Sequence, residues 1–197
     1  FPDDSHYPFG LYQLAWSYYN MNDVPIALGY LRRHISYYKK KRDDSESRTL
    51  NASEGATLDH SMKDVVTFYF EGLLKKMPGY TVSEALPAFR AVEEGPYLGT
   101  MLVLFAKLMR TRELVDSLAE WAAIVLEREY KRPEAMDVVL VNVEALYLRR
   151  AWDKVVEAAS GFRFLDQKSD GGMRKTENYG AAQKLILDVA GSMQKTI

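Results

Sequence analysis

Three consecutive residues, Asp59, His60 and Ser61, are of the types that form the catalytic triad of serine hydrolases. Neighbouring residues on a helix point to different faces, however, and triads assemble from residues that are brought together in space. The other histidines, His6 and His34, are scattered along the chain, and there is no H-E-x-x-H or comparable pair of metal ligands. We therefore expect solvated or core histidines, no catalytic residues, no metal site and no cofactor.

Other chemical signals in the sequence are equally weak. The adjacent carboxylates of Glu93 and Glu94 fall at a predicted helix end or loop, where solvation is the default. The stretch DGGMRK at 170–175 lacks the preceding strand and the glycine spacing of a phosphate-binding loop. The chain has no cysteine, which excludes disulfides, thiolate metal sites and a cysteine nucleophile. The sequence therefore favours a protein that is not an enzyme.

A basic cluster is the best local case for a nucleic acid or another acidic partner. Basic residues interleaved with tyrosines are typical of such surfaces, and this stretch contains Arg32, Arg33, Lys39, Lys40, Lys41 and Arg42 with Tyr37 and Tyr38. Acidic residues follow at once, at Asp43, Asp44 and Glu46, and the chain has a formal net charge of -1. We favour a mixed, solvated helix end and expect no nucleic-acid partner. Nucleic-acid binding through residues 32–42 is the weaker alternative.

The composition is that of a folded chain. With 197 residues, 47% of them hydrophobic, it can bury a sizeable core, and we expect one domain over residues 1–197. No apolar run reaches the roughly 18–20 residues of a membrane-spanning helix, and the apolar stretch 101–109 contains Lys107. We therefore expect no transmembrane segment. The chain begins at Phe1, which indicates a segment of a longer protein.

Apolar residues recur at helical spacing along most of the chain. Asn22 and Asp23 separate two such runs, and either residue can cap the second helix, in which Pro25 lies in the first turn. The apolar face of the first helix carries Leu11, Leu14, Ala15 and Tyr18. The apolar face of the second carries Ala27, Leu31, Ile35 and Tyr38. The alanines allow a close approach, so this stretch predicts an antiparallel helical hairpin.

Further helix pairs are predicted after the first hairpin. Asn51 and Glu54 have the spacing of a capping box, and Ser83 can cap a short helix. The pattern predicts units at about 8–42, 51–93, 95–130 and 133–162, and a final unpaired helix at about 176–196. Residues 137–143 are the only rival for a strand, and their neighbours favour helix. The predicted fold class is all-α.

The first hairpin resembles a tetratricopeptide repeat (TPR). The resemblance rests on Leu14-Ala15, Tyr18, Asn22-Asp23, Ala27 and Leu31. His34 departs from the motif, because a small residue is usual there, and no proline ends the second helix. Later units are looser: taking Tyr18, Tyr69, Met109 and Leu146 as equivalent gives steps of 51, 40 and 37 residues, against about 34 for this class. The resemblance implies antiparallel helix pairs stacked as a right-handed superhelical solenoid.

In TPR proteins the first helix of each pair lines a concave surface, so the resemblance also implies a binding groove. The implied partner-binding residues are Phe9, Tyr12, Trp16, Tyr19, Asn20, Lys63, Lys107 and Arg110. Rigid aromatic side chains suit an extended peptide or a partner helix. The open alternative is that an upstream repeat covers the aromatic residues. A carboxylate clamp for chaperone tails is not expected, because Tyr12 and Trp16 stand where Lys and Asn are needed.

These observations favour a non-catalytic scaffold that binds a protein or peptide partner, with self-association or contact with further repeats at its ends. The sequence style is also similar to that of repeat-rich bacterial cell-envelope proteins, which favours a periplasmic or cell-envelope location. The alternative is that the chain is the helical, non-catalytic arm of a larger peptidoglycan-acting enzyme.

Overall fold

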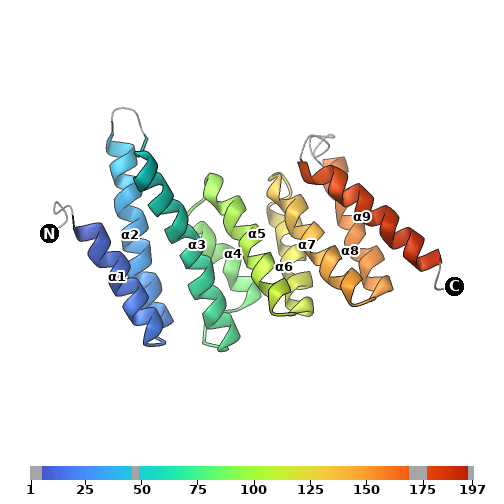
Figure 1. Ribbon diagram of the computed structural model, residues 1–197, viewed down its shortest axis with the longest axis horizontal. Helices are drawn as coiled ribbons and strands as arrows, with labels where there is room; N and C mark the ends of the chain where they lie inside the picture. Colours follow the sequence, from blue (N-terminus) through green and yellow to red (C-terminus); the bar gives the residue numbers. More distant parts are fainter. Residues whose placement is uncertain (1–5, 46–48, 169–176, 195–197) are drawn as a thin grey trace. The chain divides into compact units, whose positions relative to one another are not determined.

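The computed structural model of the protein describes residues 6–45, 49–168 and 177–194, and every regular element within these ranges is an α-helix. This confirms the all-α fold class. The helices, shown in Figure 1, are α1 (Tyr7–Asn20), α2 (Val24–Asp44), α3 (Ala52–Leu74), α4 (Val82–Arg90), α5 (Pro96–Thr111), α6 (Val115–Arg128), α7 (Glu134–Leu148), α8 (Trp152–Lys168) and α9 (Glu177–Gln194). None of them has the length and apolar character needed to cross a membrane.

The chain divides into two compact units, residues 1–101 and residues 102–197, and the division falls within α5. In the first unit α2 packs against both α1 and α3, and α3 also contacts α4. In the second unit α7 packs against both α6 and α8. The expectation of one domain over residues 1–197 stays a prediction.

Side-chain caps explain where α2, α3 and α4 begin. The Asp23 carboxylate accepts a hydrogen bond from the Ile26 amide (3.2 Å) at the start of α2. Asn51 and Glu54 form the expected capping box at the start of α3. The cap of α4 is Thr81, whose hydroxyl accepts from the Glu84 amide (3.2 Å), and not Ser83 as expected.

The second unit is built around a buried tryptophan. Trp121 on α6 is fully enclosed, and its indole N–H donates to the backbone carbonyl of Leu102 on α5 (3.1 Å). Trp121 and Phe105 pack edge to face, with ring centroids 5.0 Å apart. Because both the ring and its N–H group are satisfied, Trp121 fixes α6 against this part of α5.

One turn conformation closes the first helix of each pair. Among the described residues, the non-glycine residues with a left-handed backbone are Asn22, Lys76, Glu113 and Arg150, with φ of 63°, 52°, 57° and 56°. They follow α1, α3, α5 and α7. In every case the next amide donates to the carbonyl five residues earlier, at distances of 2.9–3.1 Å. This is the Schellman pattern of helix ends, and it gives the chain a local structural repeat.

The repeated turn corrects the register of the second helix pair. The carbonyls that accept these bonds belong to Tyr18, Gly72, Met109 and Leu146. The predicted equivalence of Tyr69 with Tyr18 is therefore wrong by three residues, and the steps are 54, 37 and 37 residues. Tyr69 is a buried residue whose hydroxyl donates to the Thr81 carbonyl (2.9 Å). It is a tyrosine like Tyr18, but it does not occupy the equivalent position in the helix pair.

The second pair also has a longer connection than the others. The second helix begins two residues after the left-handed residue in the other pairs, whereas α4 begins at Val82, six residues after Lys76. The extra residues bring Tyr80 onto α3, where a Cβ atom at Gly72 would lie 2.5 Å from its Cδ1. Gly72 is thus required by close packing.

The last helix has neighbours within the second unit. α9 contacts both α7 and α8, so the expected helix at about 176–196 is not isolated in this chain. The range that was predicted for it includes residues 176, 195 and 196, which lie outside the described residues.

We predict opposite effects for two glycine-to-alanine substitutions. Gly72→Ala should lower the free energy of unfolding by about 1–3 kcal/mol, because the new methyl group displaces the Tyr80 ring. Gly29→Ala in α2 meets no atom within 4 Å and should raise it by about 0.5–1 kcal/mol through helix propensity. Urea unfolding followed by circular dichroism measures both values. Stabilisation by Gly72→Ala would contradict the packing of Tyr80.

Candidate binding surface

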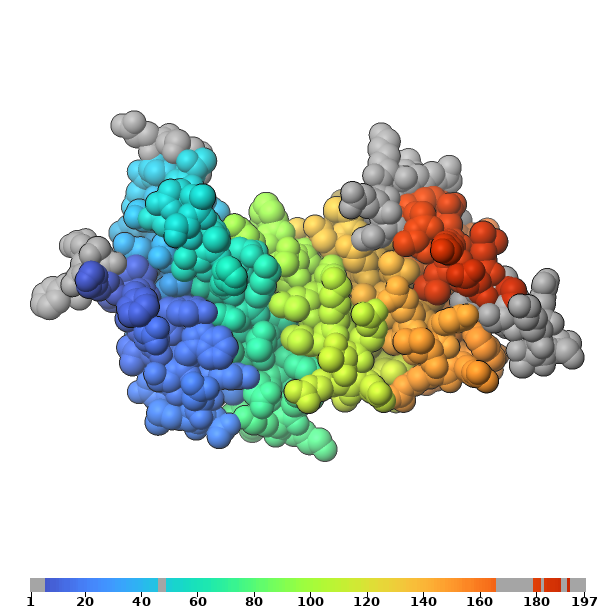
Figure 2. Space-filling view, viewed as in Figure 1, coloured from blue at the N-terminus to red at the C-terminus, as the bar shows by residue number. Residues whose placement is uncertain are grey.

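The aromatic residues of α1 lie against α3. Tyr19 stacks on Phe68 with ring centroids 4.1 Å apart, and Trp16 meets Phe68 edge to face at 5.1 Å. Trp16 also contacts the rings of Tyr12 and Tyr19, at 6.5 and 5.4 Å. Figure 2 shows the side chains of α1 (blue) beside those of α3 (teal). We call Tyr12, Trp16, Tyr19 and Phe68 the aromatic cluster.

Polar contacts continue the aromatic cluster toward α2. The Tyr12 hydroxyl donates to the Asp64 carboxylate on α3 (2.8 Å), and the Tyr12 ring lies 5.3 Å from the imidazole of His34 on α2. Burial raises the pKa of Asp64 above its usual value, and hydrogen bonds from Tyr12 and Trp16 offset only part of this shift. The cluster is therefore fixed at both ends, by ring packing and by a hydrogen bond across helices.

The structure brings the predicted groove residues of α1 to one surface, with different degrees of burial. Tyr12, Trp16 and Tyr19 are half-buried, Asn20 is exposed, and Phe9 is 65% exposed. The cover that half-buries the three rings includes α3, a helix of the same unit, whereas the alternative from sequence invoked an upstream repeat. Phe68 and Asp64, which complete the site, were missed because they lie about fifty residues away along the chain.

The predicted basic groove residues are divided between the two units. Lys63 on α3 forms an ion pair with Asp59 (2.5 Å). Arg110 pairs with Glu144 within the second unit, and Lys107 is exposed on α5 in that unit. Lys107 and Arg110 therefore belong to the second unit, whereas the α1–α3 surface belongs to the first.

The three residues of the triad-like sequence contact different partners. Ser61 hydrogen-bonds to Nδ1 of His34 (2.9 Å) and to the Thr57 carbonyl (3.0 Å), while His60 contacts the Ala56 carbonyl. His34 and Ser61 are both buried, at 1% and 0% exposure. Burial lowers the pKa of His34 to about 4. The sequence signal for this pair was the departure of His34 from the small residue of the repeat motif.

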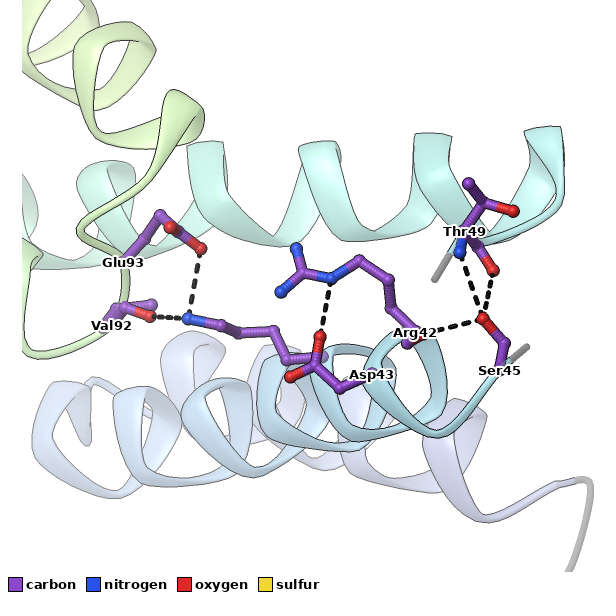
Figure 3. Close-up of polar contacts among 7 residues, drawn as sticks. Arg42, Asp43, Ser45, Thr49, Val92 and Glu93 are labelled. Carbon is purple, nitrogen blue, oxygen red and sulfur yellow. Dashed lines mark hydrogen bonds and ion pairs between the residues drawn. The ribbon is translucent and has the colours of Figure 1, made fainter. Parts of the chain in front are cut away.

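Ion pairs occupy half of the basic cluster at residues 32–42. Lys41 pairs with Glu54 (2.5 Å) and Arg42 with Asp43 (3.0 Å). Lys39 reaches the loop after α4, where it meets the Glu93 carboxylate (3.1 Å) and donates to the Val92 carbonyl (2.9 Å). Figure 3 shows both contacts and the Arg42–Asp43 pair. Lys39 and Lys41 therefore connect α2 to the loop after α4 and to α3, whereas Arg42 pairs within α2.

Glu93 is a buried carboxylate and not the solvated one expected from sequence. Its side chain is 7% exposed, and it also accepts a hydrogen bond from the Gly95 amide. Within the described residues, no three His, Cys, Asp or Glu side chains gather so as to hold a metal ion. The Lys39 ammonium group places a positive charge beside the buried Glu93 carboxylate.

We predict that the Lys39–Glu93 pair contributes to stability. Lys39→Met leaves a buried carboxylate without its cation and should cost roughly 2–3 kcal/mol. The matched control, Lys40→Met, changes an exposed lysine one position away and should cost less than about 0.5 kcal/mol. Both are measured by urea unfolding at pH 7. Adding Glu93→Gln to Lys39→Met should recover part of the loss, and equal effects of the two lysine variants would contradict the role of the pair.

The buried His34 should make stability depend on pH. The unfolded chain takes up a proton near pH 6.5, whereas folded His34 stays neutral down to about pH 4. Stability should therefore fall by roughly 2 kcal/mol from pH 7 to pH 5 through this group alone. His34→Gln should remove that part of the pH dependence, and His60→Gln, at an exposed position, should retain it. Identical pH profiles for both variants would show that folded His34 titrates normally.

Comparison with known proteins found no match for this chain. No family model matches the chain, and it matches none of the curated proteins or solved structures with which it was compared. The resemblance to TPR proteins therefore stays a prediction.

Proposed function

We propose that the protein is a non-catalytic scaffold that binds a peptide or helical segment of a partner protein on the α1–α3 surface. The aromatic cluster carries this proposal, together with the exposed Phe9 and Asn20 at the two ends of α1. Tyr and Trp are the residues most enriched at the centres of protein interfaces.

The order of the aromatic cluster supports a binding role. Trp16 and Tyr19 are held by Phe68, and Tyr12 is held by Asp64. A partner that contacts the exposed parts of these rings orders few additional side chains, so less entropy is lost on binding. The half-buried rings therefore offer a preorganised apolar surface with polar groups beside it.

The proposal that the protein is not an enzyme has its own support. His34 and Ser61, the residues with the chemistry of a hydrolase, are fully buried and bonded to each other, so neither can meet a substrate in this conformation. The repeated left-handed turns are also consistent with helix pairs that stack in a TPR-like solenoid, and this stacking is part of the proposal.

Site-specific photocrosslinking tests the scaffold function. A benzophenone amino acid at Phe9, or at Asn20, should crosslink to one and the same protein in extracts of the source cells. The matched control places the same group at Leu148, an apolar residue in the second unit that is 77% exposed. It should not give that product.

A second variant connects the crosslink to the aromatic cluster. Trp16→Ala in the Phe9-labelled chain should reduce the yield of the product at least fivefold, with the helical circular dichroism signal unchanged. A product formed equally well from Leu148, or one that survives Trp16→Ala, would overturn the assignment of this surface.

A further inference from the structure

A groove of about 650 Å³ lies within the second unit, lined by residues of α6, α7 and α8. α7 packs against both of the other helices, which barely contact each other. The groove residues on α7 (Val139, Asn142 and Leu146) are buried. The groove residues Ala123 of α6 and Lys154 and Glu157 of α8 are exposed. The groove therefore has α7 at its base and opens between α6 and α8.

Small side chains create the space in this groove. Four alanines and Gly161 are among its lining residues. Gly161 also lets α8 approach closely, because a Cβ atom there would lie 3.0 Å from Leu126 and 3.3 Å from Val139. The groove is thus mostly apolar, and its volume falls in the range of roughly 300–1,000 Å³ typical of small-molecule sites.

One polar group at the base of the groove has no partner among the residues that the structure describes. Asn142 is 5% exposed, and no described residue donates a hydrogen bond to its buried side-chain oxygen. It interrupts an otherwise apolar stretch, VVLVNV at 138–143. A buried acceptor without a donor is costly, and an apolar side chain of the same size would avoid that cost. Asn142 lines the groove, so a turn of its side chain would present the oxygen to a molecule bound there, and that molecule can supply the absent donor.

We propose that this groove binds a small, largely apolar ring compound that donates one N–H or O–H hydrogen bond to Oδ1 of Asn142. The alanine-rich walls contact the rings. Lys154 and Glu157, at the rim, lie beside any polar substituent that points to solvent. A ligand of this kind satisfies the buried acceptor and fills the apolar space at the same time.

Two compounds of nearly identical shape test the proposed hydrogen bond. Indole has an N–H donor, and benzofuran has an ether oxygen in its place. Binding to the full chain is measured by NMR titration of the isotope-labelled protein. We expect indole to bind about three- to tenfold more tightly than benzofuran, as one net hydrogen bond implies, and to shift the side-chain amide signal of Asn142. Equal affinities, or no binding of either compound at millimolar concentration, would overturn the proposal.

Three variants locate the site. Asn142→Leu should bring the affinity ratio of indole to benzofuran close to one while benzofuran still binds. Ala123→Trp fills the groove from an exposed wall position and should abolish binding of both compounds. The matched control, Ala56→Trp, changes an exposed alanine of α3 and should leave both affinities unchanged. Binding that survives Ala123→Trp with unchanged affinity would place the compounds elsewhere and overturn the assignment, without bearing on the α1–α3 surface.

Discussion

The left-handed residue that ends the first helix of each pair is the constraint on which the rest of the fold depends. For a side chain other than glycine this conformation costs about 1–2 kcal/mol, and of the residues involved only Asn22 belongs to a type that adopts it readily. Lys76, Glu113 and Arg150 adopt it because the turn satisfies helix carbonyls and lets the two helices bury their apolar faces. Once the turn is fixed, so are the faces of the two helices that meet.

Much of the fold could be predicted from sequence because its determinants are local. Helical spacing of apolar residues, the Asp23 cap and the Asn51–Glu54 capping box lie within a few residues of the helices they define. The register of the second pair could not be predicted in this way. Lysine is not a residue type that predicts a left-handed turn, so the sequence gives no signal at Lys76. Tyr69 was aligned with Tyr18 because both are aromatic. The glycine at the equivalent position, Gly72, is explained by Tyr80, which lies within the connection to α4 and packs back on α3.

The candidate surface was predicted in part for the same reason. The helical period places Tyr12, Trp16 and Tyr19 along one side of α1, but their partners Phe68 and Asp64 come from α3 and leave no trace in the local pattern. The pairing of His34 with Ser61 is likewise a contact between helices. Only the mismatch of His34 with the repeat motif indicated that this position differs. Residues that depend on distant neighbours are therefore the ones that sequence reasoning misses.

The buried polar groups at the two candidate sites differ in how their hydrogen bonds are satisfied, and this difference separates the two kinds of site. In the first unit the polar groups around the aromatic cluster satisfy one another: Tyr12 with Asp64, and His34 with Ser61. Such a network leaves nothing for a small ligand to complete, but it holds the rings in place, which suits recognition of a protein surface. In the second unit no described residue donates a hydrogen bond to the Asn142 oxygen, and Asn142 lines an apolar groove. An incomplete acceptor next to an open volume favours a molecule that brings both a donor and an apolar body, and a flat protein surface supplies neither at that depth.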